Sequence, residues 1–368
     1  MKKAVYGGTF DPPHNGHVWI VREAATLFDE VVVVLAENPD KHHMFPVEIR
    51  ERMLREVANE LPNVRIALLD SRYLVEFAAK ENVGYLVRGM RSAADFEYER
   101  TIRDVNADID PSARTVFFMP PAQLTKVSST LVKGLIGPSG WERAVARYVP
   151  SATLIRLIGR QHHWLWEAFT QVDARDRGDE DAFWCEVLTP YFEKHRTYHT
   201  WAHISAGLYE LARIQRQLEN PAATGLAWVG HDIVYDVWRD DNEERSALFV
   251  ETLAKRLNLP NAIGRSASRM VRGTKKHIGI HHDDCFLNDI DLAILGYPER
   301  DFDKYEEGVA AEYALRYTPQ EFAVGRMGWI ANFRNTHPDR IYATDLFERR
   351  YGMQAQKNLR RSIGKDRG

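Results

Sequence analysis

The sequence predicts an α/β domain with a doubly wound parallel sheet, followed by an all-α domain. In the first 150 residues, short apolar runs alternate with helical stretches, a pattern typical of βαβ units. After Pro150 strand signals nearly vanish, and apolar residues recur at helical spacing. The chain has 368 residues, more than one domain usually contains. We therefore expect domains over 1–160 and 161–368, joined within 149–161.

Five apolar runs are the candidate strands. The run 31–36 (VVVVLA) is continuous and β-branched, which suits a parallel strand buried on both faces. The other runs lie at 4–6, 64–69, 85–87 and 115–119, and a helix is expected over 46–61. Ligands bind at the carboxyl ends of parallel strands, so the segments that follow these runs are candidates for a site.

The helical half shows apolar residues at spacings of three, four and seven. The residues in this pattern are Ile204, Leu208, Leu211 and Leu218, and then Phe249, Leu253 and Leu257. Such a pattern predicts amphipathic helices that pack into a bundle.

Composition excludes several classes of protein. A net charge of −3 gives no electrostatic case for a nucleic-acid partner. No apolar run approaches the ~20 residues of a membrane span, and because the first residues enter a strand directly we expect no leader sequence. Cys185 and Cys285 lie far apart, without metal-type spacing. We expect a reduced, cytoplasmic protein, and we leave open whether it is a homo-oligomer.

The opening segment carries the clearest chemistry. Two glycines of Gly7-Gly8-Thr9-Phe10 follow a strand and let the backbone pass close to phosphate oxygens. Two imidazoles of His14-Asn15-Gly16-His17 lie on the first turn of a helix, beside its positive end. This combination favours a nucleoside triphosphate bound for attack at its α-phosphate. It resembles the HxGH signature of the nucleotidyltransferase superfamily, whose domains are Rossmann-like.

Three later segments follow predicted strands or begin helices. Lys41 follows the 31–36 strand, and 88–91 (RGMR) follows the 85–87 strand. Asp95 and Glu99 continue from Arg91 at i+4 intervals on one helix face. The hydroxyls of 128–130 precede an apolar helix, where N–H groups can hold a phosphate. The apolar stripe of the middle helix is expected in the core; it consists of Tyr98, Ile102, Val105 and Ile109.

Together these segments resemble the bacterial phosphopantetheine adenylyltransferases over residues 1–150. The shared motifs are GTFDPxxxGH, NPxKxxMF, RGxRxxxDFEYE, an Asn at 106 and SSxLVK. The resemblance implies adenylyl transfer from ATP, with Mg²⁺, to 4′-phosphopantetheine. His17 and Thr9 would stabilise the transferring phosphate, while Lys41 and Arg88 would hold the acceptor phosphate and Asn106 the pantetheine arm. The implied ATP-binding residues are Gly8, Phe10, His14, His17, Arg91, Glu99, Ser128, Ser129 and Thr130.

A second acceptor stays open. The opening GGTFDPPHNGH, with His14, also resembles the adenylyltransferases of NAD synthesis. Their acceptor is nicotinamide or nicotinate mononucleotide. In either case the resemblance implies in-line attack on the α-phosphorus and no covalent enzyme intermediate.

The helical half carries an ordered set of histidines and aspartates. His203 lies in YHTWAH, His231-Asp232 in WVGHD, and Asp291 in NDIDL. Imidazole nitrogens with carboxylate oxygens suit Mn²⁺, Fe²⁺, Co²⁺, Ni²⁺ or Mg²⁺ better than a structural zinc. On a helix Asp289 faces away from Asp291, and Asp291 is the preferred ligand.

This half resembles the HD superfamily of metal-dependent phosphohydrolases. The resemblance implies His203, His231, Asp232 and Asp291 as metal ligands, and the similarity of YHTWAH to cyclic-nucleotide phosphodiesterases implies His199 as proton donor. Candidates for the rim of the substrate site are Arg196, Asn242, Glu243, Lys275 and His277. A helical half that only senses nucleotides is the alternative.

Overall fold

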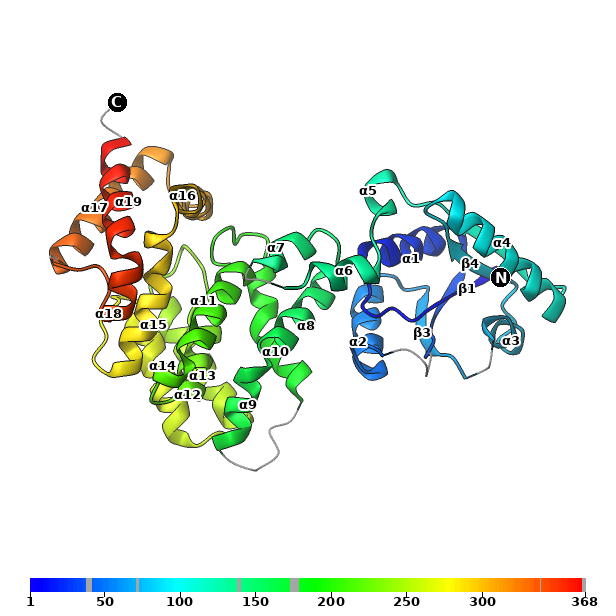
Figure 1. Cartoon of the computed structure of the whole chain (residues 1–368), viewed down its shortest axis with the longest axis horizontal. Coiled ribbons are helices and arrows are strands. Elements are labelled where there is room, and N and C mark those ends of the chain that lie inside the picture. The colour runs from blue at the N-terminus through cyan, green and yellow to red at the C-terminus, as the bar shows by residue number, and fades with distance from the viewer. Residues whose placement is uncertain (38–41, 71–72, 138–139, 173–178, 338, 366–368) are drawn as a thin grey trace. The chain divides into compact units, whose positions relative to one another are not determined.

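The computed structural model describes residues 1–37, 42–70, 73–137, 140–172, 179–337 and 339–365. The chain divides into two compact units, Met1–Leu157 and Ile158–Gly368 (Figure 1). Within the described residues, no helix is both long and apolar enough to cross a lipid bilayer.

The first unit is built on a five-stranded parallel sheet in the order β3-β2-β1-β4-β5. All five predicted strands are confirmed. They are β1 (Lys3–Gly8), β2 (Glu30–Leu35), β3 (Val64–Leu68), β4 (Tyr85–Gly89) and β5 (Arg114–Phe118). The strand order reverses between β1 and β4. In such a sheet the crevice for a ligand opens at the carboxyl ends of those two strands.

Helices cover both faces of this sheet. Val31, Val33 and Leu35 of β2 pack in a core that includes residues of α1 and α2. Val32 and Val34 of the same strand pack in a second core with α3. A strand buried on both faces explains the continuous VVVV run. The helices are α1 (Asn15–Leu27), α2 (Val47–Ala58), α3 (Leu74–Lys80), α4 (Ala93–Ile109), α5 (Ala122–Thr125), α6 (Ser129–Leu135) and α7 (Trp141–Val145).

The apolar stripe of α4 is not in the core, contrary to the sequence prediction. Tyr98 is 63% exposed, Val105 47% and Ile109 40%, and Phe96 beside them is 44% exposed. The one buried residue of α4 is Glu99. The spacing of the apolar residues correctly predicts that they share one face of the helix. It does not predict burial, because the same spacing occurs whether or not another element covers that face.

The second unit is helical, as predicted, and its described residues form no strand. Trp228, Ile204 and Leu208 are at most 1% exposed and lie in its core. Leu218 is buried but lies beyond the helix that carries Ile204, since a 3₁₀ turn at Gln215–Gln217 intervenes. The helices are α8 (Ser151–Gln161), which begins in the first unit, α9 (His163–Val172), α10 (Glu180–Leu188), α11 (Trp201–Ile214), α12 (Pro221–Gly230), α13 (Asn242–Arg256), α14 (Asn261–Thr274), α15 (His282–Leu292), α16 (Glu299–Tyr313), α17 (Pro319–Thr336), α18 (Asp345–Phe347) and α19 (Met353–Lys365).

Candidate functional sites

A cleft of about 280 Å³ opens where β1 and β4 end. Tyr6 and Gly7 of β1 and Arg88 and Gly89 of β4 contribute to its walls. This is the crevice that the reversal of strand order predicts. The predicted site residues that line it are His14, His17, Arg88, Arg91, Glu99, Ser128 and Ser129.

His14 and His17 cap the first turn of α1. His14 Nδ1 accepts hydrogen bonds from the backbone N–H of Gly16 (3.1 Å) and of His17 (3.4 Å). His17 Nδ1 accepts one from the backbone N–H of His14 (3.3 Å), and the two rings stack with centroids 3.6 Å apart. A Cβ on Gly16 would lie 3.0 Å from the His14 ring, so glycine at this position gives the ring room to fold over the turn.

Burial and this capping together fix the protonation of both rings. Burial, with the charge of Arg91, lowers the pKa of His14 to about 3. Burial also lowers the pKa of His17 well below its usual range, helped by His14 and Arg91. Both imidazoles are therefore neutral near pH 7. Because each Nδ1 accepts a hydrogen bond, the proton of each ring is on Nε2, which leaves that atom as a donor for an anion.

Arg88 is held by Glu99 in a two-pronged ion pair. Arg88 Nε lies 2.5 Å from Glu99 Oε2, and Arg88 Nη2 lies 2.9 Å from Glu99 Oε1. Glu99 is 9% exposed. Both carboxylate oxygens thus bind the guanidinium, and Glu99 fixes the direction in which Arg88 meets the cleft.

Arg91 and the two serines connect the cleft to α6. Arg91 Nη1 donates to the carbonyl of Val127 (2.9 Å), directly before that helix. Ser128 Oγ caps α6 by accepting from the N–H of Leu131 (3.0 Å), and Ser129 Oγ donates to the carbonyl of Pro12 (2.9 Å). Ser128 therefore has the capping role that its position predicts, whereas the Ser129 hydroxyl ties α6 to the segment before α1.

Several predicted residues lie outside the walls of the cleft. Thr130 is exposed, and Asn106 is half-buried on α4. Gly8 ends β1, and Thr9 and Phe10 follow it. Phe10 is 1% exposed and packs edge-on against His17 with ring centroids 4.8 Å apart. Lys41 lies outside the described residues. Sequence reasoning missed Tyr6, Ile20 and Pro120, which line the cleft without a recognisable motif.

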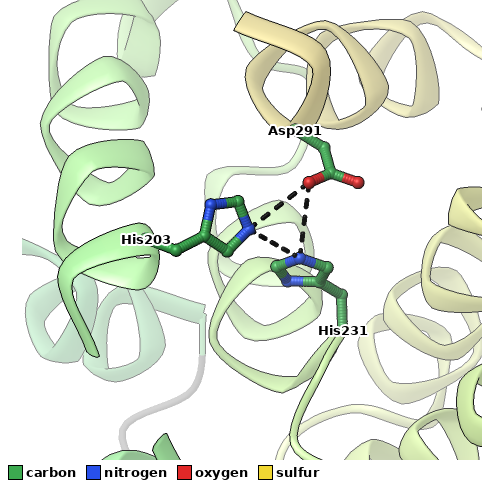
Figure 2. A group of neighbouring side chains, drawn as sticks. All are labelled: His203, His231 and Asp291. Carbon is green, nitrogen blue, oxygen red and sulfur yellow. Dashed lines mark hydrogen bonds and ion pairs between the residues drawn. The ribbon is translucent and has the colours of Figure 1, made fainter. Parts of the chain in front are cut away.

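The second unit brings the predicted metal ligands together. His203 of α11, His231 directly after α12 and Asp291 of α15 point at one another (Figure 2). His203 Nε2 lies 3.2 Å from His231 Nε2 and 3.3 Å from Asp291 Oδ1, and His231 Nε2 lies 3.7 Å from Asp291 Oδ1. Asp232 Oδ2 lies 2.9 Å from His231 Nε2 and 3.9 Å from His203 Nε2.

The spacings of 3.2 Å and 3.3 Å suit one divalent cation, and those of 3.7 Å and 3.9 Å are wider. With metal–ligand bonds of ~2.1 Å, neighbouring ligand atoms of a tetrahedral or octahedral site are ~3.0–3.4 Å apart. The Nδ1 of His231 lies 2.8 Å from the carbonyl of Trp228, which fixes the proton there and leaves Nε2 as a ligand atom. Burial disfavours the charge of Asp291, but its hydrogen bonds to His203, His231 and His277 keep the pKa of this carboxyl well below its usual range.

His199 lies beside this cluster and is anchored by a residue that sequence reasoning missed. Its Nδ1 lies 2.7 Å from Glu312 Oε2, and its Nε2 lies 4.0 Å from Asp232 Oδ2. Burial disfavours the imidazolium, but the charges of Asp232 and Glu312 outweigh it and raise the pKa of His199. His199, which is not one of the predicted metal ligands, is thus suited to carry a proton beside the cluster.

Asp289 and Arg196 have structural contacts outside the cluster. Asp289 accepts hydrogen bonds from the N–H groups of Ala343 and Thr344 (both 2.7 Å). Its contacts therefore differ from those of Asp291, which faces His203. Arg196 is 5% exposed and donates to the carbonyls of Asp232 (2.7 Å) and Ile233 (2.9 Å), so it shapes the loop. The other rim candidates line a cavity with Asp232 and Asp291: Asn242, Glu243, Lys275 and His277.

Comparison with known proteins identifies the first unit. Residues 5–135 match the cytidylyltransferase-like family model. The phosphopantetheine adenylyltransferase of Neisseria meningitidis serogroup C (strain 053442) is 45% identical over 162 residues, which are 44% of this chain and 95% of that protein. The phosphopantetheine adenylyltransferase of Chromobacterium violaceum is 46% identical over 158 residues, covering 43% of this chain and 96% of that protein. These matches lie in the N-terminal ~160 residues. Since the chain contains nearly the whole length of such relatives, it belongs to the phosphopantetheine adenylyltransferase family.

Proposed function

We propose that the first unit transfers the adenylyl group of ATP to 4′-phosphopantetheine, giving dephospho-coenzyme A and pyrophosphate. The 45% identity over 95% of a phosphopantetheine adenylyltransferase carries this proposal. The walls of the cleft also suit the chemistry, because two neutral imidazoles and two guanidiniums line one cleft of about 280 Å³.

In this reaction an oxygen of the acceptor phosphate forms a bond to the α-phosphorus of ATP. The bond from that phosphorus to the bridging oxygen breaks, and pyrophosphate leaves with the electron pair. Arg88, held by Glu99, would orient the acceptor phosphate, and the Nε2–H groups of His14 and His17 would donate to the oxygens on which charge develops. Mg²⁺ bound with ATP would neutralise the triphosphate.

Product analysis tests this assignment. The protein should release pyrophosphate and form dephospho-coenzyme A from ATP and 4′-phosphopantetheine. Nicotinamide and nicotinate mononucleotide, the alternative acceptors, should give no product in parallel reactions. Turnover of a pyridine mononucleotide without turnover of phosphopantetheine would overturn the assignment.

We propose that the second unit is a metal-dependent phosphohydrolase of the HD type. The convergence of His203, His231 and Asp291, with ligand atoms within 4.8 Å of one another, carries this proposal. Asp232 Oδ2, at 2.9 Å from His231 Nε2, would complete the ligand set. The mixed nitrogen and oxygen donors suit Mn²⁺, Fe²⁺, Co²⁺, Ni²⁺ or Mg²⁺.

Hydrolysis would proceed by attack of water on phosphorus. A divalent cation bound to these residues would lower the pKa of that water and polarise the phosphate. As the new P–O bond forms, the ester P–O bond breaks, and His199 would give its proton to the leaving oxygen. The products of a monoester are inorganic phosphate and an alcohol. Glu312 would hold the His199 ring in position, since its Oε2 lies 2.7 Å from Nδ1.

Metal analysis together with a mutant tests the second proposal. Protein purified without chelator should contain about one or two divalent ions per chain, and His231→Ala with Asp232→Ala should remove most of them. Hydrolysis of phosphate esters should vanish, while adenylyl transfer persists because the two sites are built from residues of different units and sites without shared partners act nearly independently. A double variant that keeps its metal and its hydrolase activity would contradict the site. A purely nucleotide-sensing unit would bind metal but hydrolyse no ester.

A further inference from the structure

The cluster of His203, His231 and Asp291 lies beside a cavity that is much larger than a phosphate group. Its volume is about 680 Å³, within the ~300–1,000 Å³ that binding pockets for drug-sized ligands usually have. Asp232 and Asp291, together with His199, form part of its wall. A substrate whose phosphorus lies at the cluster would therefore have its organic part inside the same cavity.

Aromatic rings from α16, from α17 and from Tyr317 in the segment between them form another part of the wall. Tyr313 lies at their centre, with its ring 5.9 Å from that of Phe322 and 6.1 Å from that of Tyr317. Tyr305 and Trp329 line the same cavity. Rings grouped in this way favour a flat, polarizable partner, because offset stacking and edge-to-face contacts add to the burial of apolar area.

The cations of the wall already have partners. Arg239 Nε and Nη2 lie 2.6 Å and 2.8 Å from the two carboxylate oxygens of Asp241. Arg326 Nη2 lies 2.6 Å from Glu306 Oε1, and Lys275 Nζ lies 3.6 Å from Glu243 Oε2.

Carboxylates share this wall with the cations. Asp240, Glu243 and Glu321 also line the cavity. A second or third phosphate would therefore meet paired cations and carboxylates, and its negative charge would be poorly compensated.

From these contacts we infer that the second unit acts on a compound with one phosphoryl group, esterified to an alcohol that carries a planar ring. Nucleoside monophosphates belong to this class, and nucleoside di- and triphosphates do not. The inference rests on the proposed phosphohydrolase function and adds its substrate class. The reaction joins water to phosphorus, breaks the ester P–O bond and returns the proton to the ring-bearing alcohol.

A pair of esters with alcohol leaving groups of similar basicity tests the ring. Benzyl phosphate carries a flat ring, while cyclohexylmethyl phosphate has nearly the same size and a puckered one. The metal-loaded protein should hydrolyse benzyl phosphate with about tenfold higher kcat/KM. Tyr313→Leu should remove most of this preference, and Tyr313→Phe should keep it. Trp238→Leu, which alters an exposed aromatic residue outside the cavity wall, should leave it unchanged.

Uridine phosphates test the number of phosphoryl groups, and they lack the adenine that the first unit is proposed to bind. Uridine monophosphate should be hydrolysed with at least tenfold higher kcat/KM than uridine diphosphate. Equal or faster hydrolysis of the diphosphate would overturn the single-phosphate part. Equal rates for the benzyl and cyclohexylmethyl esters would overturn the ring part.

A readout without metal separates this inference from the proposed function. Saturation-transfer difference NMR on the chelator-treated full chain should show transfer to the ring protons of benzyl phosphate, and Tyr313→Leu should abolish it. If no ester is hydrolysed by any metal-loaded protein, the phosphohydrolase proposal fails. The NMR signal then tests the ring site by itself. Saturation transfer that Tyr313→Leu removes supports the ring site, and the absence of transfer overturns it.

Discussion

The Glu312 carboxylate binds His199 through both the ring and the backbone. Oε2 lies 2.7 Å from Nδ1 of the ring, and Oε1 accepts the backbone N–H groups of Thr197, Tyr198 and His199 at 2.7–3.0 Å. The hydroxyl of Tyr235 donates to Oε2 (2.8 Å), and its ring stacks on His199 with centroids 4.2 Å apart. One buried carboxylate therefore fixes the loop, the ring and the direction of Nε2.

Glu312→Gln should lower kcat of the phosphohydrolase about 10²-fold for alkyl esters, with little change in KM. The loss should be much smaller for 4-nitrophenyl phosphate, because a good leaving group needs no proton from His199. A purely structural role would affect both esters equally. Glu307→Gln, an exposed change on the same helix, is the control. An equal loss for the two esters would contradict the positioning role.

The ion pair of Arg88 with Glu99 makes a prediction about the acceptor. Glu99→Ala frees the guanidinium, so KM for 4′-phosphopantetheine should rise about tenfold, while KM for ATP changes little. The resemblance to the family implies instead that Glu99 contacts ATP. Steady-state kinetics with each substrate varied in turn distinguishes the two roles, because a direct ATP contact would raise KM for ATP. Glu97→Ala, an exposed change on α4, is the control.

The sequence was sufficient to predict elements whose signal is local. The β-branched run of β2 is buried on both faces, and it predicts a parallel strand in any context. The strand ends then predict where a ligand lies, which is why His17 and Arg88 could be assigned to one cleft. The histidines and aspartates of the second unit could likewise be predicted to lie together, because they can hold one cation only if they converge.

Features that depend on distant contacts could not be predicted. Glu312 is separated by 113 residues from His199, and within α16 it is one acidic residue among several. The stripe of α4 has the period of a buried helix face, yet Tyr98 is 63% exposed because no described element of the chain covers it. Periodicity gives the direction of a side chain but not its neighbour.

His17 should be essential to adenylyl transfer. Its Nδ1 accepts a hydrogen bond from the backbone N–H of His14 (3.3 Å), so its Nε2–H is available for the α-phosphate. We expect His17→Ala to lower kcat by ~10² or more, the usual loss for one transition-state donor, with a smaller effect on KM for ATP. Pyrophosphate release measures both. His337→Ala in the second unit is the control, and an unchanged kcat for His17→Ala would show that the motif only caps the helix.

Asp289 and Asp291 offer a matched pair for the metal. They lie on the same helix, but Asp291 Oδ1 faces His203 Nε2 (3.3 Å), whereas Asp289 accepts from Ala343 and Thr344. Asp291→Asn should lose most of the bound metal and remain folded. Asp289→Asn should keep the metal and lose about 1–3 kcal/mol of stability. Metal content and thermal unfolding, each with and without chelator, measure the two effects, and the reverse pattern would exchange their roles.

His162 predicts a sensitivity of the second unit to acid. It is 1% exposed, and its Nε2 has no hydrogen-bond partner among the described residues. Burial lowers the pKa of His162 to about 3, so the folded chain keeps it neutral, while the unfolded chain binds a proton below about pH 6.5. Between these values the unfolded state binds more protons, and stability falls by up to ~1.4 kcal/mol for each pH unit of acidification. His162→Phe removes this loss of stability in acid. The Tm of the variant minus that of the wild type should therefore increase as the pH is lowered from 7.5 to 5. His163→Phe, at a neighbouring exposed position, should follow the wild type, and the same behaviour in His162→Phe would refute the buried neutral imidazole.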